Sequence, residues 1–255
     1  MIKKAVCMAL ILLAVIGKVN AGDIQVIGEE MYPAQYTDES GQVTGITAEL
    51  VKELLRRLDL KDEIKLFPWK RAYRMALQGP DIALFEMTRT AEREEFFKWV
   101  GPINRADWGL YALASSKIVI NRLEDAKQAG QICGYRGDAR AEYLVKKGFS
   151  NITNVEVGRP IQCARMLEKG RLDLWIASEM GLSELLKTEN KARSDYKLVF
   201  PIDVKYLFIA FSKHTSDDVI DLWQKELDKM KKDGTMMKFY QGKYPDEVIM
   251  DLISK

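Results

Sequence analysis

The 255-residue sequence contains little of what metal enzymes and nucleophilic hydrolases require. It has a single histidine, His214, and three cysteines. Without a second histidine or a cysteine cluster, no segment has the ligand spacing of a zinc site. The histidine is accompanied by no nucleophile-elbow motif, and the sequence has no phosphate-binding glycine loop. We therefore expect no metal, no cofactor and no catalytic triad, and we interpret His214 as a surface residue.

Basic clusters and long apolar runs are also scarce. The 39 basic residues balance 37 acidic ones and form no cluster interleaved with aromatic side chains, so no nucleic-acid partner is expected. The apolar run at residues 5–17 is shorter than the ~20 residues of a membrane span. It follows Lys3 and Lys4 and precedes a possible cleavage site at residues 19–21. We interpret residues 1–21 as a signal peptide for export to the periplasm, with an N-terminal anchor helix as the alternative.

The chain that such a cleavage leaves has the composition of a folded globular protein. Cleavage removes three of the 39 basic residues and none of the 37 acidic ones, so the net charge becomes about −1. Two cysteines remain, Cys133 and Cys163, and in an exported protein such a pair is a disulfide candidate. Two buried free thiols are the alternative, because the sequence does not show whether the two Cβ atoms meet.

What the sequence does contain is an alternation of short apolar strands and amphipathic helices. The predicted strands are residues 23–28, 64–68 and 81–85, and the predicted helices between them are residues 46–58 and 69–79. Thr47 is the expected N-cap of the first helix. This β-α-β-α-β order predicts a parallel sheet flanked by helices.

A second copy of the pattern follows. Its predicted strands are residues 130–137 and 172–176, and its predicted helices are residues 139–148 and 160–170. Two apolar segments, residues 109–116 and 205–213, have the character of strands that cross between two halves. A helix over residues 216–232 then begins the C-terminal segment. Two similar α/β halves are what a two-lobed protein contains.

The positions of polar residues indicate a ligand site. In open α/β sheets ligands bind beyond the carboxyl ends of the strands. Residues 29–36, 86–93, 136–140 and 177–181 fall there. In the second of these segments, Thr90 is expected to cap a helix that begins at Ala91 and carries Arg93 in its first turn. A guanidinium is unfavourable there for the helix but well shaped to hold a carboxylate. The residues alone leave open whether Arg93 binds a ligand or pairs with Glu92 or Glu94.

Residues 45–54, 76–102 and 170–179 carry a resemblance to a known family. The most specific part is a T-x-x-x-x-R motif followed by F-x-x-x-G-P. The chain resembles the family 3 solute-binding proteins, the periplasmic receptors for polar amino acids that serve ABC transporters, over nearly all of the mature chain. This implies a periplasmic-binding-protein fold of two α/β lobes, each a mostly parallel sheet flanked by helices, joined by two hinge strands. The expected division is residues 22–110 and 207–255 for lobe 1, and residues 111–206 for lobe 2.

The resemblance also assigns candidate ligand-binding residues. Arg93 matches the family's arginine that binds the α-carboxylate of the ligand, and Thr88 matches the hydroxyl residue that also contacts this carboxylate. Tyr32 matches an aromatic residue that covers the ligand, and Trp69 is a second candidate for that cover. The implied ligand is a small polar solute such as an amino acid, and the implied partner of the monomeric protein is an ABC permease or a membrane receptor.

The remainder of the expected pocket departs from the family pattern. Many members have a serine where Glu86 stands, and threonines where this chain has Asp138 and Ala139. They have an aspartate for the α-amino group where Ser178 stands, with Glu179 next to it. The additional acids at positions 86, 138 and 179 suit a cationic ligand such as a basic amino acid or an amine. The alternative is that each acid faces solvent or pairs with Arg136, Arg140 or Arg159.

Three functions stay open on this reasoning. The first is a binding protein that captures an amino acid without catalysis. The second is an enzyme, because some proteins that resemble this family are periplasmic dehydratases acting on cyclohexadienyl acids. Glu86 or Glu179 would then be the general acid, which requires a raised pKa. The third is a ligand-binding partner that acts in trans on a membrane sensor.

Overall fold

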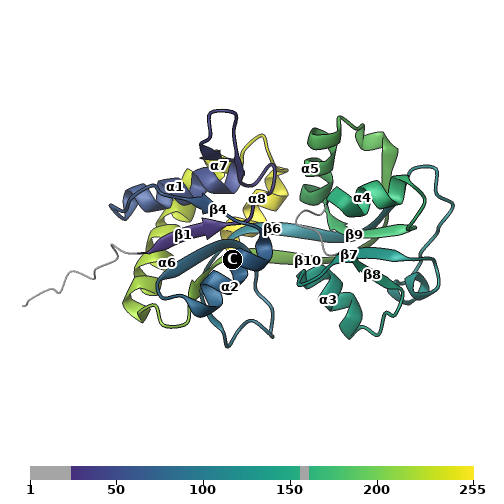
Figure 1. Cartoon of the computed structure of the whole chain (residues 1–255). Helices are drawn as coiled ribbons and strands as arrows, with labels where there is room; N and C mark the ends of the chain where they lie inside the picture. Colours follow the sequence, from purple (N-terminus) through teal and green to yellow (C-terminus); the bar gives the residue numbers. More distant parts are fainter. Residues whose placement is uncertain (1–23, 156–160) are drawn as a thin grey trace, which may run out of the picture.

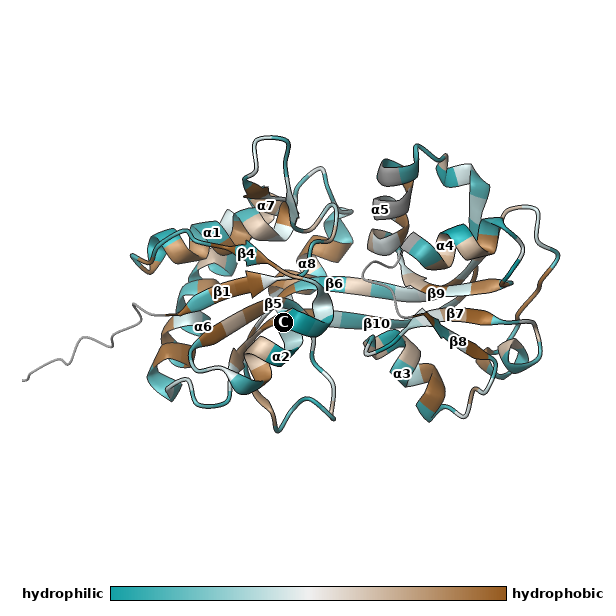
Figure 2. Ribbon diagram, viewed as in Figure 1, coloured by the Kyte–Doolittle hydropathy of each residue, from teal (hydrophilic) through white to brown (hydrophobic). Residues whose placement is uncertain are grey.

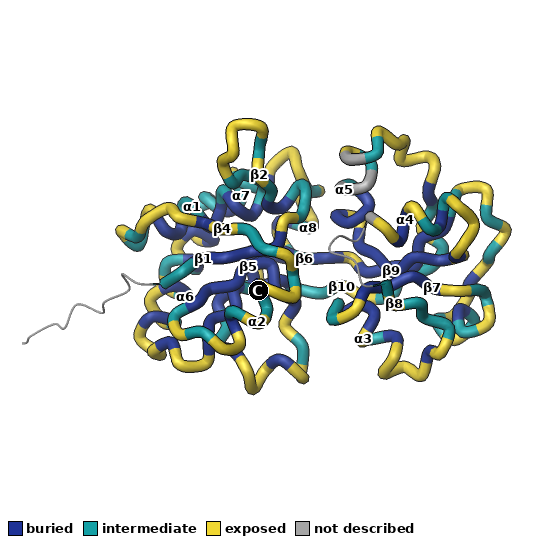
Figure 3. Tube along the Cα trace, viewed as in Figure 1, coloured by how far each residue is buried: buried dark blue, intermediate teal, exposed yellow. Residues whose placement is uncertain are grey.

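The computed structural model describes residues 24–155 and 161–255 and has two lobes joined by two long strands (Figure 1). The predicted signal peptide, residues 1–21, lies outside the described residues, as does Arg159. Within the described ranges, no helix is both long and apolar enough to cross a membrane. The apolar residues concentrate on the strands inside each lobe, and the outer loops are exposed (Figures 2 and 3).

Lobe 1 is built on three parallel strands in the order β4 (Lys65–Leu66), β1 (Gln25–Gly28) and β5 (Ile82–Thr88). Its helices are α1 (Ile46–Arg57), α2 (Trp69–Gln78), α6 (Asp217–Lys232), α7 (Thr235–Tyr240) and α8 (Asp246–Ser254). A small hairpin of β2 (Tyr36–Thr37) and β3 (Val43–Thr44) lies in the loop after β1. The sheet packs on both faces, because α1 and α6 bury Leu54 and Trp223 in one cluster and α2 buries Ala72 in another.

Two 17-residue strands, β6 (Phe97–Leu113) and β10 (Tyr196–Ser212), connect the lobes. They pair antiparallel over their whole length, from Ser212 opposite Phe97 to Tyr196 opposite Leu113. Both strands extend beyond the apolar segments that predicted them. Their additional residues include Asp107 and Asp203, which are polar and exposed where the strands pass between the lobes, so the apolar pattern did not reveal this part. The lobe boundaries expected from the sequence fall within or at the edge of these two strands.

Lobe 2 repeats the architecture with the parallel strands β9 (Leu174–Ser178), β7 (Ile132–Tyr135) and β8 (Ile152–Val155). Its helices are α3 (Ala139–Lys146), α4 (Ile161–Glu168) and α5 (Glu179–Glu189), with 3-10 turns η1 (Leu123–Lys127) and η2 (Arg193–Asp195). Because β9 pairs with β6 and β5 pairs with β10, the described strands other than β2 and β3 form a continuous sheet in the order β4-β1-β5-β10-β6-β9-β7-β8.

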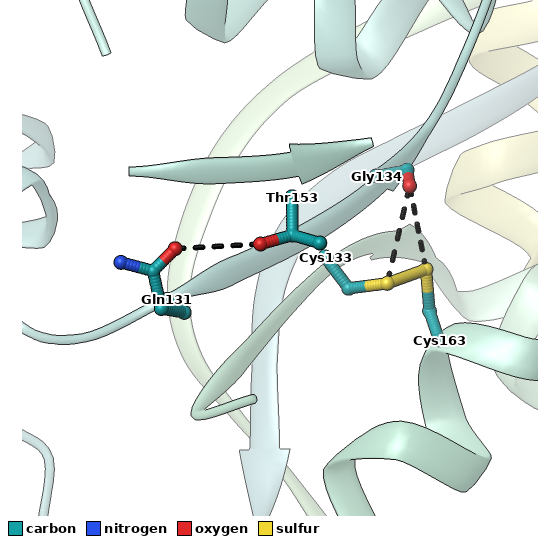
Figure 4. Close-up of a disulfide and its surroundings, with 5 residues drawn as sticks. All are labelled: Gln131, Cys133, Gly134, Thr153 and Cys163. Carbon is teal, nitrogen blue, oxygen red and sulfur yellow. Dashed lines mark hydrogen bonds between the residues drawn. A yellow bond between two sulfur atoms is a disulfide. The ribbon is translucent and has the colours of Figure 1, made fainter. Parts of the chain in front are cut away.

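Cys133 and Cys163 form a disulfide between β7 and α4 of lobe 2 (Figure 4). Their Cα atoms are 5.5 Å apart, and both residues are fully buried. The sulfurs lie beside the carbonyl oxygen of Gly134. The sequence left a disulfide and two free thiols as alternatives, and the structure has the disulfide.

The prediction of a helix that begins at Ala91 is wrong. Residues 91–96 form turns, in which the backbone N–H of Arg93 donates to the carbonyl of Thr90 at 3.0 Å. β6 begins at Phe97, so the turns over residues 91–96 lead directly into that strand. Thr47 is also not the N-cap of α1, which is Gly45, because the Thr47 side chain instead accepts a hydrogen bond inside the protein.

Candidate ligand-binding site

A pocket with about 500 Å³ of space, partly open to solvent, lies between the two lobes. It is at the carboxyl ends of β1, β5, β7 and β9, where α/β sheets bind ligands. Lobe 1 lines it with Glu29, Met31, Trp69, Glu86, Thr88 and Arg93, and lobe 2 lines it with Tyr135, Asp138, Ala139, Arg140, Ser178 and Met180. The crossing strands complete the lining with Ala106, Trp108 and Leu207.

Arg93 is held in this pocket and is only 5% exposed. Its Nη1 donates to the carbonyl of Thr88 at 3.2 Å, and its Nη2 is 3.5 Å from the carbonyl of Gly137 in lobe 2. The neighbouring acids that could have paired with it bind other cations, because Glu92 contacts Lys146 and Glu94 binds Arg89. The guanidinium therefore keeps donors for a ligand carboxylate.

Trp69, the first residue of α2, lies beside Arg93 and reaches the other lobe. The guanidinium carbon of Arg93 is 5.3 Å from the centre of the Trp69 ring and 5.4 Å from that of Tyr73, within cation–π range. The indole Nε1 donates to the carbonyl of Gly137 at 3.0 Å. The side chain thus joins lobe 1 to lobe 2 at the edge of the pocket.

Glu86 is an acid in an unusual backbone conformation inside the pocket. Its φ is 62°, in the left-handed region, which costs about 1–3 kcal/mol for such a residue. The pairing of β10 with β5 shifts register beside it, between Phe208 and Ala210. A bulge of this kind redirects a side chain next to a site. Glu86 is 8% exposed, and one of its carboxylate oxygens, Oε2, is buried without a hydrogen-bond partner.

The surroundings of Glu86 favour its protonated form. The other oxygen, Oε1, accepts a hydrogen bond from Asn104 Nδ2 at 2.9 Å, and the same amide donates to Thr47 Oγ1 at 3.1 Å. Burial raises the pKa of Glu86 to about 7, and hydrogen bonds with Thr47 and Asn104 offset part of this shift. The carboxyl group therefore exchanges its proton near neutral pH.

Asp138 begins α3 and pairs with Arg140. Its Oδ1 accepts hydrogen bonds from the Arg140 backbone N–H at 2.9 Å and from Nε at 2.8 Å, and its Oδ2 accepts from Nη2 at 2.8 Å. Burial raises the pKa of Asp138, but the charge and hydrogen bonds of Arg140 outweigh burial and hold the pKa below its usual value. Arg140 Nη1 also donates to Ser178 Oγ at 3.4 Å. Of the alternatives for this acid, the structure has the pairing with arginine.

Tyr32 and Glu179 are not among the residues that line this pocket. The ring of Tyr32 packs against Tyr36 at 5.1 Å, and Lys187 Nζ from lobe 2 lies 4.0 Å from its centre. Glu179 is exposed, binds Arg193 Nε at 3.0 Å and lines a separate cleft. The structure thus brings together Trp69, Glu86, Thr88, Arg93, Asp138 and Ser178. A ligand contact for Tyr32 or Glu179 stays a prediction.

Two residues next to the pocket acids were not assigned to the site from the sequence. Arg140, which lines the pocket, was considered there only as a partner for the acids, because an arginine in the first turn of a helix is normally a solvent-exposed residue. Asn104 binds Glu86 without lining the pocket, and it lies in a strand that the apolar pattern did not reveal. For Arg140, the available signal in the sequence was its position two residues after Asp138 at the start of a helix. In the described residues, no group of three or more histidines, cysteines or acids could hold a metal ion.

The fold agrees with the comparison to known families. The sequence matches the model of the bacterial extracellular solute-binding proteins, family 3, over residues 24–244. The chain belongs to this family. The L-cystine-binding protein TcyA of Bacillus subtilis is 24% identical over 225 residues, which are 85% of this chain and 78% of that protein.

Solved structures with the same fold come from proteins of different roles. A histidine kinase sensor domain similar to periplasmic binding proteins has a TM-score of 0.77 and 16% identity, over 86% of this chain and 95% of that one. The ancestral amino acid-binding protein AncCDT-1, a precursor of cyclohexadienyl dehydratase, has a TM-score of 0.71 and 20% identity, over 86% of this chain and 93% of that one. At these identities the likeness shows the fold alone.

Proposed function

We propose that this protein is a periplasmic binding protein that captures a carboxylate-bearing solute of the amino-acid class for import by an ABC permease. The observation that carries the proposal is Arg93, a buried guanidinium in the pocket whose neighbouring acids are paired elsewhere. Family membership and the similarity to TcyA support an amino acid as the ligand. Binding and release are then the whole of its chemistry.

Closure of the two lobes provides the binding mechanism. The carbonyl of Gly137 in lobe 2 accepts a hydrogen bond from Trp69 and lies next to Arg93, both of lobe 1. A ligand carboxylate bound to Arg93 is therefore covered when the lobes approach. Excluding water from that contact strengthens it, because the local dielectric constant falls. The strands β6 and β10 are the hinge across which this motion occurs.

The charge of the pocket narrows the ligand further. Asp138 is neutralised by Arg140, so it adds no net charge that favours a cation. Glu86 is the pocket acid with an unpartnered oxygen. Of the three acids that suggested a cationic ligand, at positions 86, 138 and 179, Glu86 is the one that still supports it.

Replacement of Arg93 tests the proposed function. A thermal-shift screen of the twenty protein L-amino acids first identifies a ligand, because a ligand that binds only the folded state raises the melting temperature. Arg93→Ala should then weaken binding of that ligand by about 100-fold or more in calorimetry, since a buried charge-pair partner is lost. Arg74→Ala, an exposed arginine of α2, is the matched control and should bind normally. Unchanged affinity of Arg93→Ala would contradict the proposal.

A dehydratase is the second candidate, favoured by a single observation. Glu86 is a buried acid in the pocket whose pKa is about 7, as a general acid requires. Incubation of the purified protein with prephenate or arogenate, followed by detection of aromatic product, tests this. Product formed by the wild type and not by Glu86→Gln would establish catalysis, and absence of product with both substrates would leave binding as the function.

The sensor alternative is tested in a different way. The fold is shared with a histidine kinase sensor domain, so the same clamp can serve signalling. Genes for a permease and an ATPase beside this gene favour transport, whereas a neighbouring membrane kinase favours sensing.

A further inference from the structure

We infer that Lys187 of α5 and the rings of Tyr32 and Tyr36 form a latch between the lobes, which stabilises the closed form without contacting the solute. This inference goes beyond the proposed function, because it concerns a contact outside the pocket that sets how readily the lobes close. Tyr32, Tyr36 and Lys187 are not among the residues that line the pocket. The latch therefore acts equally on every solute that the pocket binds.

The two tyrosines form a site for a cation on lobe 1. Their ring centres are 5.1 Å apart, and the ring planes are inclined to each other by 57°. The Nζ of Lys187, from lobe 2, lies 4.0 Å from the centre of the Tyr32 ring and 4.4 Å from that of Tyr36. Both distances are well inside the limit of about 6 Å for a cation–π interaction. One ammonium group thus contacts two rings of the opposite lobe.

The loop that carries the tyrosines is fixed by hydrogen bonds of its own backbone. Met31 and Gln35 exchange two backbone hydrogen bonds, of 2.7 and 2.9 Å, on either side of Tyr32. The carbonyls of Pro33 and Ala34 accept hydrogen bonds from the first N–H groups of α1. The rings are therefore held in position before the lobes meet, so little conformational entropy is lost when the lysine arrives.

The helix α5 couples the latch to the pocket, and it lies opposite the loop that carries β2 (Figure 3). The helix follows the pocket residue Ser178 directly, and its Met180 lines the pocket and packs in one apolar cluster with Met31 of lobe 1. Lys187 comes seven residues after Met180, which is two helical turns, so both side chains lie on one face of α5. A movement that closes the pocket at Met180 therefore brings Lys187 onto the rings.

The latch changes affinity through the population of the closed form. The apparent affinity of a protein is reduced by the fraction of it that is in the binding-competent form. Lys187 is exposed, and an exposed cation–π contact stabilises only modestly, so loss of the ammonium should lower the ratio of closed to open protein about fivefold. When the two forms are close in free energy, each solute should then bind about three- to fivefold more weakly.

Replacement of the lysine tests the latch. Lys187→Met keeps an apolar side chain of similar length and removes the ammonium. The probes are three L-amino acids from the thermal-shift screen that differ in their side chains. We expect all three to bind about three- to fivefold more weakly by the same factor, mainly through faster dissociation in stopped-flow experiments. Lys191→Met is the matched control and should behave as the wild type, because this exposed lysine pairs with Glu168 inside lobe 2.

A double-mutant cycle identifies the partner of the lysine. Tyr36→Leu removes one of the two rings and should weaken the three amino acids about two- to threefold. Combining Tyr36→Leu with Lys187→Met should weaken them no more than Lys187→Met alone, because both changes remove the same interaction. Independent, additive effects of the two changes would overturn the latch.

The latch also has a readout that needs no solute. Spin labels on Glu39→Cys in lobe 1 and Arg171→Cys in lobe 2, both exposed positions, report the distance between the lobes by pulsed electron resonance. In solute-free protein, Lys187→Met should shift the distance distribution towards the longer, open separations. Lys191→Met should leave the distribution as in the wild type.

The outcomes separate this inference from the proposed function. If Lys187→Met leaves both the distances and the affinities unchanged, the latch is overturned and the binding function stands. Weakening that differs from one amino acid to another would assign these side chains to ligand contact and also overturn the latch. If the wild type binds no amino acid while Lys187→Met still opens the solute-free protein, the proposed function fails and the latch stands.

Discussion

At the residue scale, the pocket is defined by which charges are neutralised and which are not. Asp138 and Arg140 cancel each other, with side chains that are 11% and 10% exposed. Arg93 and Glu86 keep unfilled hydrogen-bonding capacity, one as a donor and one as an acceptor. A ligand that carries a carboxylate matches the donors of Arg93 in this pocket.

The burial of Glu86 should also make stability depend on pH. Its pKa is raised from 4.5 to about 7 in the folded state, so its favourable contribution is complete below pH 4.5 and is lost as pH rises through about 7. The shift corresponds to at most about 3 kcal/mol. Without ligand, Glu86→Gln should therefore gain stability relative to the wild type between pH 5 and pH 8, measured by urea unfolding. An equal difference at both pH values would refute the raised pKa.

The sequence predicted some of these residues and not others, for physical reasons. Arg93 and Thr88 belong to a motif with fixed spacing, so they could be identified before their positions were known. The burial of Glu86 could not, because an acid after a strand normally marks the exit to solvent. The pairing of Asp138 with Arg140 depends on side-chain conformations at the start of α3, which residue types do not specify.

At the scale of elements, helices were predicted better than the crossing strands. The apolar periodicity of α1, α2 and α6 indicated each of them to within a few residues. The strands β6 and β10 carry polar residues at their centres, so only their apolar ends were recognised. The turn before β6 was mistaken for a helix, because local cap signals do not reveal how soon the next strand begins.

The disulfide between β7 and α4 should contribute measurably to stability. It closes a loop with a sequence separation of 30, for which the chain-entropy model gives about 3–4 kcal/mol. The double variant Cys133→Ala, Cys163→Ala should lose a comparable free energy of unfolding in urea, and reduction of the wild type should reproduce that loss. A midpoint insensitive to reductant would show that the bridge does not form in the protein.

At the scale of the whole molecule, the described residues join the lobes away from the hinge through an apolar cluster, in which Met31 and Ala34 of lobe 1 pack with Ala139 and Met180 of lobe 2, and through a few polar contacts. Trp69 donates to Gly137, Glu92 contacts Lys146, and Lys187 lies over Tyr32. Exposed ion pairs contribute little to stability. The free-energy difference between the open and closed forms is therefore expected to be small, and a ligand that bridges the lobes can shift the equilibrium.

Trp69→Phe should shift the equilibrium between the open and closed forms. The phenyl ring keeps most of the stacking on Arg93 but loses the hydrogen bond to Gly137, worth about 1 kcal/mol, so ligand affinity should fall about fivefold. Small-angle scattering should show a smaller radius on ligand addition in the wild type and a weaker response at equal ligand in the variant. Trp99→Phe is a suitable control, because its buried indole nitrogen has no hydrogen-bond partner. Equal affinities in both variants would exclude a role for the Trp69 contact.

The position of Trp69 has a practical consequence. An indole that faces a guanidinium on one lobe and donates to a carbonyl on the other changes its polar surroundings whenever the lobes separate. Its fluorescence emission is thus a label-free optical signal for opening and closing. The protein thus carries its own sensor for the solute it binds, and the spectral change should be smaller in Trp69→Phe, where Trp108 of the pocket lining remains.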